Sequence, residues 1–373
     1  GMWPLPYGVS YNSYLIDDEM VALVDTVDIC YFEVYLRKIK QVIGERPINY
    51  LIINHMEPDH SGSIRLIKQH YPEIIIVGNK QTFGMIEGFY GVTGEQYLVK
   101  EGDFLALGHH KLRFYMTPMV HWPETMMTFD ETDGVLFSGD GFGCFGTVDG
   151  GFLDTRINVD KYWGEMVRYY SNIVGKYGSP VQKALQKLGG LPISAICSTH
   201  GPVWTENIAK VIGIYDRLSR YDADEGVVIA YGSMYGNTEQ MAEAIAEELS
   251  AQGVKNIVMH NVTKSHPSYI IADIFRYKGL IIGSPTYSNQ IFPEVEALLS
   301  KILLREVKGR YLGYFGSFTW AGAAVKRLAE FAEKSKFELV GDPVEMKQAM
   351  KDLTYTQCEN LARAMADRLK KDR

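Results

Sequence analysis

The alternation of apolar and polar positions divides the chain into two stretches with different patterns. Up to about Tyr221, short apolar runs alternate with loops rich in glycine, histidine, aspartate and proline. Strands are expected at 21–27, 48–53, 74–77, 112–117, 126–129, 135–138 and 193–197, and helical spacing occurs at 31–43, 64–70 and 159–177. This mixed order predicts sheets covered by helices rather than an all-β sandwich.

From Val227 the pattern becomes a regular alternation of strands and helices. The expected strands are 227–231, 255–260, 279–283, 310–316 and 337–340, with helices starting near Thr238, Pro293, Ala321 and Glu345. This alternation predicts a doubly wound five-stranded parallel sheet. The short polar segment 221–226 is typical of a linker, so the expected domains are 1–222 and 226–373.

Composition is consistent with this division. A chain of 373 residues is long enough for two cores, and 46% apolar with 22% charged residues is typical of soluble globular protein. No apolar run approaches the roughly 18 residues of a membrane span, and no secretory signal is visible. The four cysteines are scattered, which fits a reducing cytoplasm and predicts a cytoplasmic protein.

Charge is shared unevenly between the two stretches. Residues 1–225 hold 19 Lys and Arg against 28 Asp and Glu, whereas residues 226–373 hold 19 against 17. An acidic N-terminal half argues against nucleic acid as its partner, because phosphate binding needs clustered cations.

One loop concentrates potential metal ligands. Residues 54–60 read Asn-His-Met-Glu-Pro-Asp-His and follow an apolar strand, which brings together His55, Glu57, Asp59 and His60. Alternate side chains of an extended segment share a side, so the first three are expected to fan out together. Imidazole and carboxylate without thiolate suit iron, manganese or zinc.

Three further candidates, His121, Asp140 and His200, also follow apolar strands. Seven such groups are too many for one metal and suit two ions that share a carboxylate. A single histidine is more often structural than a ligand, and the other five histidines are interpreted that way. The cluster at 55–60 differs, because crowding carboxylates and imidazoles is costly without a cation.

Three loops of the C-terminal stretch predict a flavin site. Residues 232–238, Gly-Ser-Met-Tyr-Gly-Asn-Thr, join a strand to a helix start, where backbone N–H groups and the helix dipole bind phosphate. The loop has no lysine, which disfavours a nucleoside triphosphate, and taken alone it is equally an ordinary helix cap. The later loops 284–289 and 317–322 follow parallel strands, and their Tyr287 and Trp320 are placed either to flank a planar ring or to pack in the core.

The candidate cofactor-binding residues are spread over these three loops. They are Ser233, Met234, Tyr235, Gly236, Asn237, Thr238, Pro285, Thr286, Tyr287, Ser288, Asn289, Ser317, Phe318, Thr319, Trp320, Ala321 and Gly322.

The motif H-x-E-x-D-H at 55–60, followed by His121-Trp-Pro, Asp140 and the segment 200–204, resembles the flavodiiron proteins, and the three loops match the flavodoxin pattern. The resemblance covers nearly the entire chain. It implies an α/β protein with a metallo-β-lactamase-like αββα sandwich, a flavodoxin-like domain, a diiron site and FMN. It also implies that His55, Glu57 and His121 bind one iron, that Asp59, His60 and His200 bind the other, and that Asp140 bridges them.

Related hydrolases carry histidine where Glu57 stands and usually bind zinc, so glutamate favours a harder redox metal. The resemblance implies reduction of dioxygen to water, of nitric oxide to N2O, or of both. Electrons would pass through FMN from an external rubredoxin-type donor, within a head-to-tail homodimer or a dimer of such dimers. The alternatives are a dizinc hydrolase with a regulatory flavodoxin domain and a metal-free flavin electron carrier.

Two departures from the family pattern lead to further expectations. Family members usually carry about twenty residues before the 3–7 segment, as the first strands of the metal domain, so an open sheet edge is expected here. No rubredoxin-like C-x-x-C segment follows the flavodoxin-like part, which predicts a separate electron donor.

Overall fold

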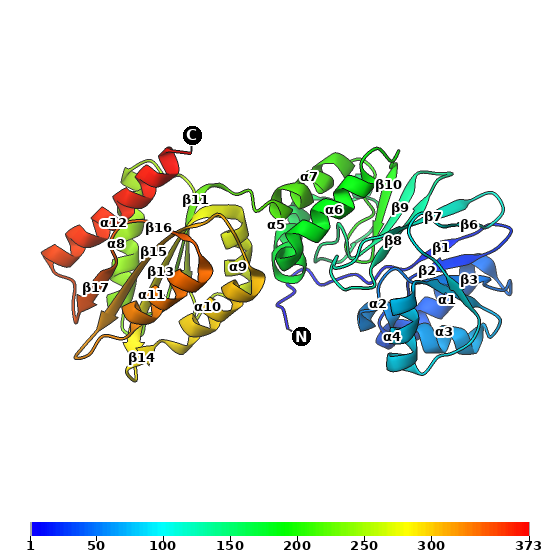
Figure 1. Ribbon diagram of the computed structural model, residues 1–373, viewed down its shortest axis with the longest axis horizontal. Coiled ribbons are helices and arrows are strands. Elements are labelled where there is room, and N and C mark those ends of the chain that lie inside the picture. Colours follow the sequence, from blue (N-terminus) through cyan, green and yellow to red (C-terminus); the bar gives the residue numbers. More distant parts are fainter. Residues whose placement is uncertain (1, 373) are drawn as a thin grey trace. The chain divides into compact units, whose positions relative to one another are not determined.

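The computed structural model describes residues 2–372 and consists of two compact units (Figure 1). One contains residues 5–170 and 177–219, and the other contains residues 2–4, 171–176 and 220–372. The segment 171–176 belongs to the C-terminal unit because Asn172 Nδ2 donates to the Ser268 carbonyl at 2.9 Å and Gly175 lies against the Phe275 ring.

Two sheets form the centre of the N-terminal unit. The first has the order β1 (Tyr14–Ile16), β2 (Ala22–Val24), β3 (Tyr50–Ile52), β4 (Ile75–Gly78) and β5 (Gln96–Leu98), with only β1 antiparallel to its neighbour. The second has the order β10 (Ala195–Ser198), β9 (Val135–Gly139), β8 (Met126–Asp130), β7 (Lys111–Met116) and β6 (Phe104–Ala106). Side chains alternate along β3, so Leu51 packs with helix residues and Ile52 packs between the sheets.

Helices cover the outer faces of both sheets. Helices α1 (Phe32–Ile43), α3 (Ile64–His70) and α4 (Lys80–Tyr90) lie on the first sheet, and α2 (Pro58–Ser61) is a short turn beside them. Helices α5 (Asp160–Tyr169), α6 (Gly178–Leu188) and α7 (Ile208–Ser219) lie beyond the second sheet (Figure 1). The expected αββα sandwich is therefore confirmed.

The C-terminal unit is a doubly wound parallel sheet, as expected. Its order is β12 (Ile257–Asn261), β11 (Asp224–Tyr231), β13 (Tyr277–Tyr287), β15 (Tyr311–Phe318) and β16 (Glu338–Leu339). Strand β17 (Val344–Lys347) also pairs with β15, and β14 (Gln290–Ile291) adds an antiparallel pair to β13. Helices α8 (Asn237–Ala251) and α12 (Asp352–Lys370) cover one face, and α9 (Pro267–Arg276), α10 (Pro293–Arg305) and α11 (Ala324–Ser335) cover the other (Figure 1).

Some expected elements differ from the structure. The helix expected near Glu345 is wrong, because 344–347 forms β17 and the helix starts at Asp352. Val344 and Met346 are buried while Glu345 and Lys347 are exposed, which is the two-residue period of a strand. Strands β1, β5 and β6 and helices α4, α6, α7 and α9 were not predicted.

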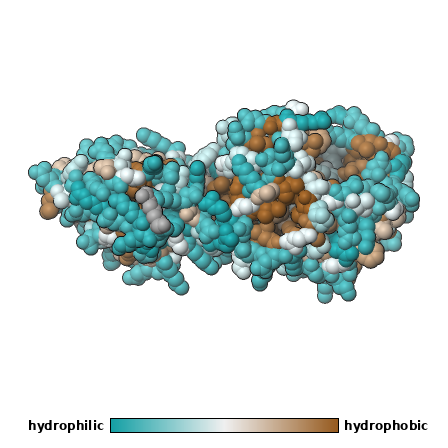
Figure 2. Space-filling view, turned by 90° about the horizontal axis from the view of Figure 1, so that it is seen from above, coloured by the Kyte–Doolittle hydropathy of each residue, from teal (hydrophilic) through white to brown (hydrophobic). Residues whose placement is uncertain are grey.

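The surface of the N-terminal unit includes apolar regions. Figure 2 shows apolar side chains gathered in a hollow of this unit. A groove of about 910 Å³ borders β1, the end strand of its sheet, and its lining includes Leu15, Val34 and Phe152. Among residues 2–372, no helix is long and apolar enough to cross a bilayer.

Candidate metal centre and cofactor loops

The metal-ligand candidates follow strands that end at one edge of the sandwich. Strands β7, β9 and β10 run in the same direction, because β8 is antiparallel to β7 and β9 while β10 is parallel to β9. His121, Asp140 and His200 follow these three strands, and the 55–60 segment follows β3 of the other sheet. A 3.0 Å hydrogen bond from Met126 N to the Asn54 carbonyl joins the two sheets at this edge.

Pro58 divides the 55–60 segment into two parts. Glu57 is extended, and Pro58 starts the one-turn helix α2 with its φ angle already suited to a helix. Asp59 and His60 therefore lie on a helical turn, and the expectation that Asp59 fans out beside His55 and Glu57 is wrong.

The seven candidates form two groups. His55, Glu57, His121 and Asp140 have ligand atoms within 4.8 Å of one another, and so do Asp59, His60 and His200. Asp140 contacts both groups, since its Oδ2 lies 3.0 Å from His121 Nε2 and its Oδ1 lies 2.9 Å from His60 Nε2. One carboxylate thus faces two possible ion positions with its two oxygens.

The electrostatics of the cluster favour a cation. Burial alone would raise the pKa of Asp140, but the histidines around it, His60 foremost, hold that pKa well below its usual range. Burial would lower the pKa of His55, but carboxylates, Asp140 foremost, raise it well above the usual value. Against burial, Asp140 and Glu57 raise the pKa of His121 to about 9, and His121 and His55 lower the pKa of Glu57 to about 2. The carboxylates therefore create a negative field that a metal ion would neutralise.

Unpaired buried atoms also fit metal ions. His55 Nε2, Asp59 Oδ1 and both ring nitrogens of His60 have no hydrogen-bond partner of good geometry among residues 2–372. Buried polar atoms are costly without partners, and coordination of an ion would satisfy them. Four imidazoles and three carboxylates without thiolate suit iron, manganese or zinc.

Three contacts to the candidates were missed by the sequence analysis. Thr199 Oγ1 donates a 2.7 Å hydrogen bond to Asp140 Oδ1, and His200 Nδ1 lies 2.7 Å from the Ser10 carbonyl oxygen. The third is Glu124, which is fully buried and contacts His55. Thr199 and Glu124 stand one and three positions from a candidate ligand, which was the only signal available in the sequence.

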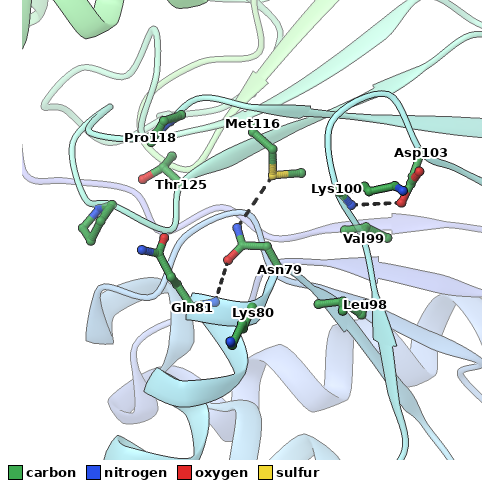
Figure 3. Close-up of a pocket in the computed structure, with 11 residues that line it drawn as sticks. Asn79, Lys80, Gln81, Leu98, Val99, Lys100, Asp103, Met116, Pro118 and Thr125 are labelled. Atoms are coloured by element: carbon green, nitrogen blue, oxygen red, sulfur yellow. Dashed lines mark hydrogen bonds between the residues drawn. The ribbon is translucent and has the colours of Figure 1, made fainter.

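A pocket of about 670 Å³ lies beside the segment that carries His121 (Figure 3). Pro118 and Thr125 line it on that side, and Asn79, at the start of α4, lines the other. Asn79 Oδ1 accepts from Gln81 N at 3.0 Å, and its Nδ2 donates to the Glu124 carbonyl at 2.6 Å. Asn79 therefore caps α4 and holds the His121 segment at the same time.

The predicted cofactor loops lie together at the carboxyl ends of β11, β13 and β15. Gly236 has φ +88°, a left-handed conformation that favours glycine, and α8 begins at the next residue. Thr238 and Ser317 are buried, and their hydroxyl oxygens are 2.8 Å apart, which links the first loop to the third. This pair of hydroxyls at a helix N-terminus fits a phosphate.

The second loop is shorter than expected, because β13 continues to Tyr287 and forms a hairpin with β14. Ser288 and Asn289, the two turn residues, both have positive φ angles, as a type I′ turn requires. Thr286 Oγ1 accepts from Ala323 N at 3.0 Å, which holds the second loop against the third. The Tyr287 and Trp320 side chains are exposed rather than packed in the core, which leaves both rings free to flank a flat ligand.

Comparisons with known proteins match both units. Residues 9–201 match the family model described as ODP family beta lactamase, and residues 229–360 match the flavodoxin family model. The anaerobic nitric oxide reductase flavorubredoxin of Vibrio vulnificus is 33% identical over 336 residues, which cover 89% of this chain and 68% of that protein.

Solved structures match nearly the entire chain. The rubredoxin oxygen:oxidoreductase of Desulfovibrio gigas is 31% identical with a TM-score of 0.95, covering 98% of this chain and 92% of that one. The flavodiiron protein of Giardia intestinalis is 26% identical with a TM-score of 0.91, covering 98% and 91%.

Proposed function

Because this chain belongs to the flavodiiron protein family, whose members are oxidoreductases with FMN and a diiron centre, we propose that it reduces dioxygen to water, nitric oxide to N2O, or both. The observation that carries the proposal is the placement of Asp140, whose two carboxylate oxygens face two separate groups of metal-ligand candidates. Such a carboxylate is suited to bridging two ions.

The proposed ligands of the first iron are His55, Glu57 and His121. Those of the second are Asp59, His60 and His200, with Asp140 shared. When bound, the two metals supply the redox chemistry on the diatomic gas, and FMN supplies the electrons. The protein's own part is to orient the ligands: Thr199 holds one Asp140 oxygen, and the Ser10 carbonyl holds His200 Nδ1, so that Nε2 faces the centre.

The proposed FMN site uses all three cofactor loops. The α8 N-terminus with Thr238 and Ser317 holds the phosphate, while Tyr287 and Trp320 flank the flavin ring. The remaining residues predicted for these loops complete the proposed FMN site. A rubredoxin-type protein is the proposed electron donor, which is supported by the rubredoxin in the names of two relatives.

The test is anaerobic stopped-flow mixing of the fully reduced, iron-loaded protein with dioxygen and, separately, with nitric oxide. Flavin reoxidation faster than in an Asp140→Ala variant with the same FMN content is expected for at least one gas. Equal rates in the two proteins with both gases would refute the proposal and favour an electron carrier. Zinc without iron, after iron-replete anaerobic expression, would favour a hydrolase.

We also propose that the working unit is a head-to-tail homodimer in which the FMN of one chain serves the diiron centre of the other. It is supported by the separation of metal candidates and cofactor loops into different units. Two inactive variants test this pairing between chains. One is Asp140→Ala, and the other combines Gly236→Asp with Thr238→Asp. Asp at a left-handed position and at a buried phosphate site should abolish FMN binding. Co-refolded mixed dimers should regain turnover, and abundant mixed dimers without turnover would contradict the pairing.

A further inference from the structure

Glu124 is a buried carboxylate with a specific position against a metal-ligand candidate. Its side chain has no exposure to solvent, and its Oε1 lies 2.9 Å from His55 Nδ1. The same oxygen accepts a 2.9 Å hydrogen bond from the Met56 N–H. The His55 ring and the Met56 backbone N–H therefore contact the same Glu124 oxygen atom.

This contact determines which nitrogen of His55 carries the proton. The Met56 N–H can only donate, so Oε1 acts as an acceptor and His55 Nδ1–H donates to it. In the neutral imidazole, the form that binds a metal ion, the lone pair is then on Nε2, which lies 3.5 Å from Glu57 Oε2 and 3.6 Å from Asp140 Oδ2. His55 Nε2 has no hydrogen-bond partner of good geometry among the described residues.

The position of Glu124 is itself determined by residues outside the metal cluster. Asn79 Nδ2 donates to the Glu124 carbonyl at 2.6 Å. Asn79 Oδ1 caps the start of α4, where it accepts from Gln81 N (Figure 3). Thr117 N donates to the Thr125 carbonyl at 3.0 Å, which closes the segment that also carries His121. One segment thus supplies a candidate ligand and orients a second one.

We propose that Glu124 is a positioning residue for the first iron: it holds His55 Nδ1–H so that Nε2 is presented to the metal. A carboxylate behind a histidine ligand fixes the ring and makes the opposite nitrogen a better donor. Glu124 is not a ligand itself, because it lies on the Nδ1 side of the ring, opposite the nitrogen that faces the cluster. The inference depends on the proposed metal role of His55.

The test measures iron binding rather than turnover. Full-length, FMN-loaded protein is freed of iron and titrated anaerobically with Fe²⁺ against a competing chelator. Glu124→Met keeps the volume but removes the acceptor, so one of two iron affinities should fall by about 10-fold to 100-fold with FMN content unchanged. Glu124→Gln retains an acceptor oxygen and should keep most of the iron affinity that Glu124→Met loses.

The same substitution in a protein that lacks His55 separates positioning of the histidine from a general loss of stability. If Glu124 acts through His55, Glu124→Met should cause no further loss of iron affinity in a His55→Ala protein. Two results would overturn the role: losses of iron affinity that add fully in the double variant, or equally weakened binding of both irons in Glu124→Met. If Glu124→Met does not fold, Glu124→Asp replaces it, because it keeps the charge and is one methylene too short. Wild-type iron affinity in Glu124→Asp would then overturn the inference.

The His55→Ala protein distinguishes failure of this inference from failure of the proposed function. Iron binding that is weakened by His55→Ala and unaffected by Glu124→Met would remove only the role of Glu124. Iron binding that is unaffected by His55→Ala would remove the ligand assignment of His55 and, with it, the positioning role.

Discussion

Thr128 Oγ1 donates a 2.8 Å hydrogen bond to the side-chain oxygen of Asn54, which joins the two sheets of the N-terminal unit directly next to His55. Both residues are fully buried, and Asn54 Nδ2 also lies 3.4 Å from the Phe137 carbonyl. The residue before the first candidate ligand therefore belongs to the sheet-to-sheet contact, and the geometry of the metal cluster depends on how the sheets pack.

Thr128→Val should destabilise the N-terminal unit by about 1–3 kcal/mol, because it leaves a buried amide oxygen without its donor. Thr128→Ser keeps the hydroxyl and serves as the matched control. Urea unfolding of the two iron-free variants, monitored by tryptophan fluorescence, gives the difference between their free energies of unfolding. Identical midpoints for Val and Ser would show that the hydrogen bond contributes little.

Asp140→Ala should lose both irons and retain FMN, whereas His60→Ala should lose mainly one iron. The reason is that Asp140 faces both groups of candidates, while His60 belongs to one. Iron and flavin content per chain, measured after iron-replete expression, checks this difference. Two tightly bound irons in Asp140→Ala would contradict the bridging assignment.

Thr238→Ala and Ser317→Ala should each raise the Kd for FMN by about 10-fold or more, since each hydroxyl would donate to the phosphate charge. Riboflavin, which lacks the phosphate, is the matched ligand. Its affinity, measured by flavin fluorescence quenching, should change little in either variant. A parallel loss for riboflavin would show that the hydroxyls maintain the loop rather than bind phosphate.

Arg310→Met should lower the stability of the C-terminal unit by about 2–5 kcal/mol. The buried guanidinium donates to the Ile274 and Phe275 carbonyls at 2.7 and 2.8 Å, at the end of α9, and to the Tyr221 carbonyl at 2.9 Å. Burial lowers the pKa of Arg310 to about 10, so it is charged at neutral pH. The temperature at which FMN is released measures this loss of stability. Arg310→Lys, which has fewer donors, should release FMN at an intermediate temperature.

Asp154 should make stability depend on pH. Burial opposes its ionisation, but hydrogen bonds from Thr205 and Asn207 outweigh burial and lower its pKa. A lowered pKa stabilises the fold above the unfolded-state pKa of about 4, and this contribution is lost as pH falls through the folded-state value. The stability difference between wild type and Asp154→Asn should therefore be largest near neutral pH and shrink in acid. A difference that is constant with pH would contradict this assignment.

Local pattern alone determined much of this protein. One local signal was missed. Val344 and Met346 alternate with polar residues as in a strand, yet the segment was predicted as a helix start. The motif at 55–60 and the loop at 232–238 were recognisable because ligand chemistry and phosphate-binding turns are encoded in adjacent residues. Strands such as β3, β4 and β11 were predicted because runs of branched apolar residues specify buried strands.

Only the tertiary structure decided which contacts bring the candidates together, although the family resemblance had already implied the same two groups. Pro58 starts a helix that turns Asp59 and His60 toward His200, and the registers of β7, β9 and β10 bring His121, Asp140 and His200 to one edge. Glu124 reaches His55 across 69 positions, and Thr238 reaches Ser317 across 79. Such distances depend on strand register and on the packing of one sheet against another, which involve residues far apart in the chain and leave no local spacing to read.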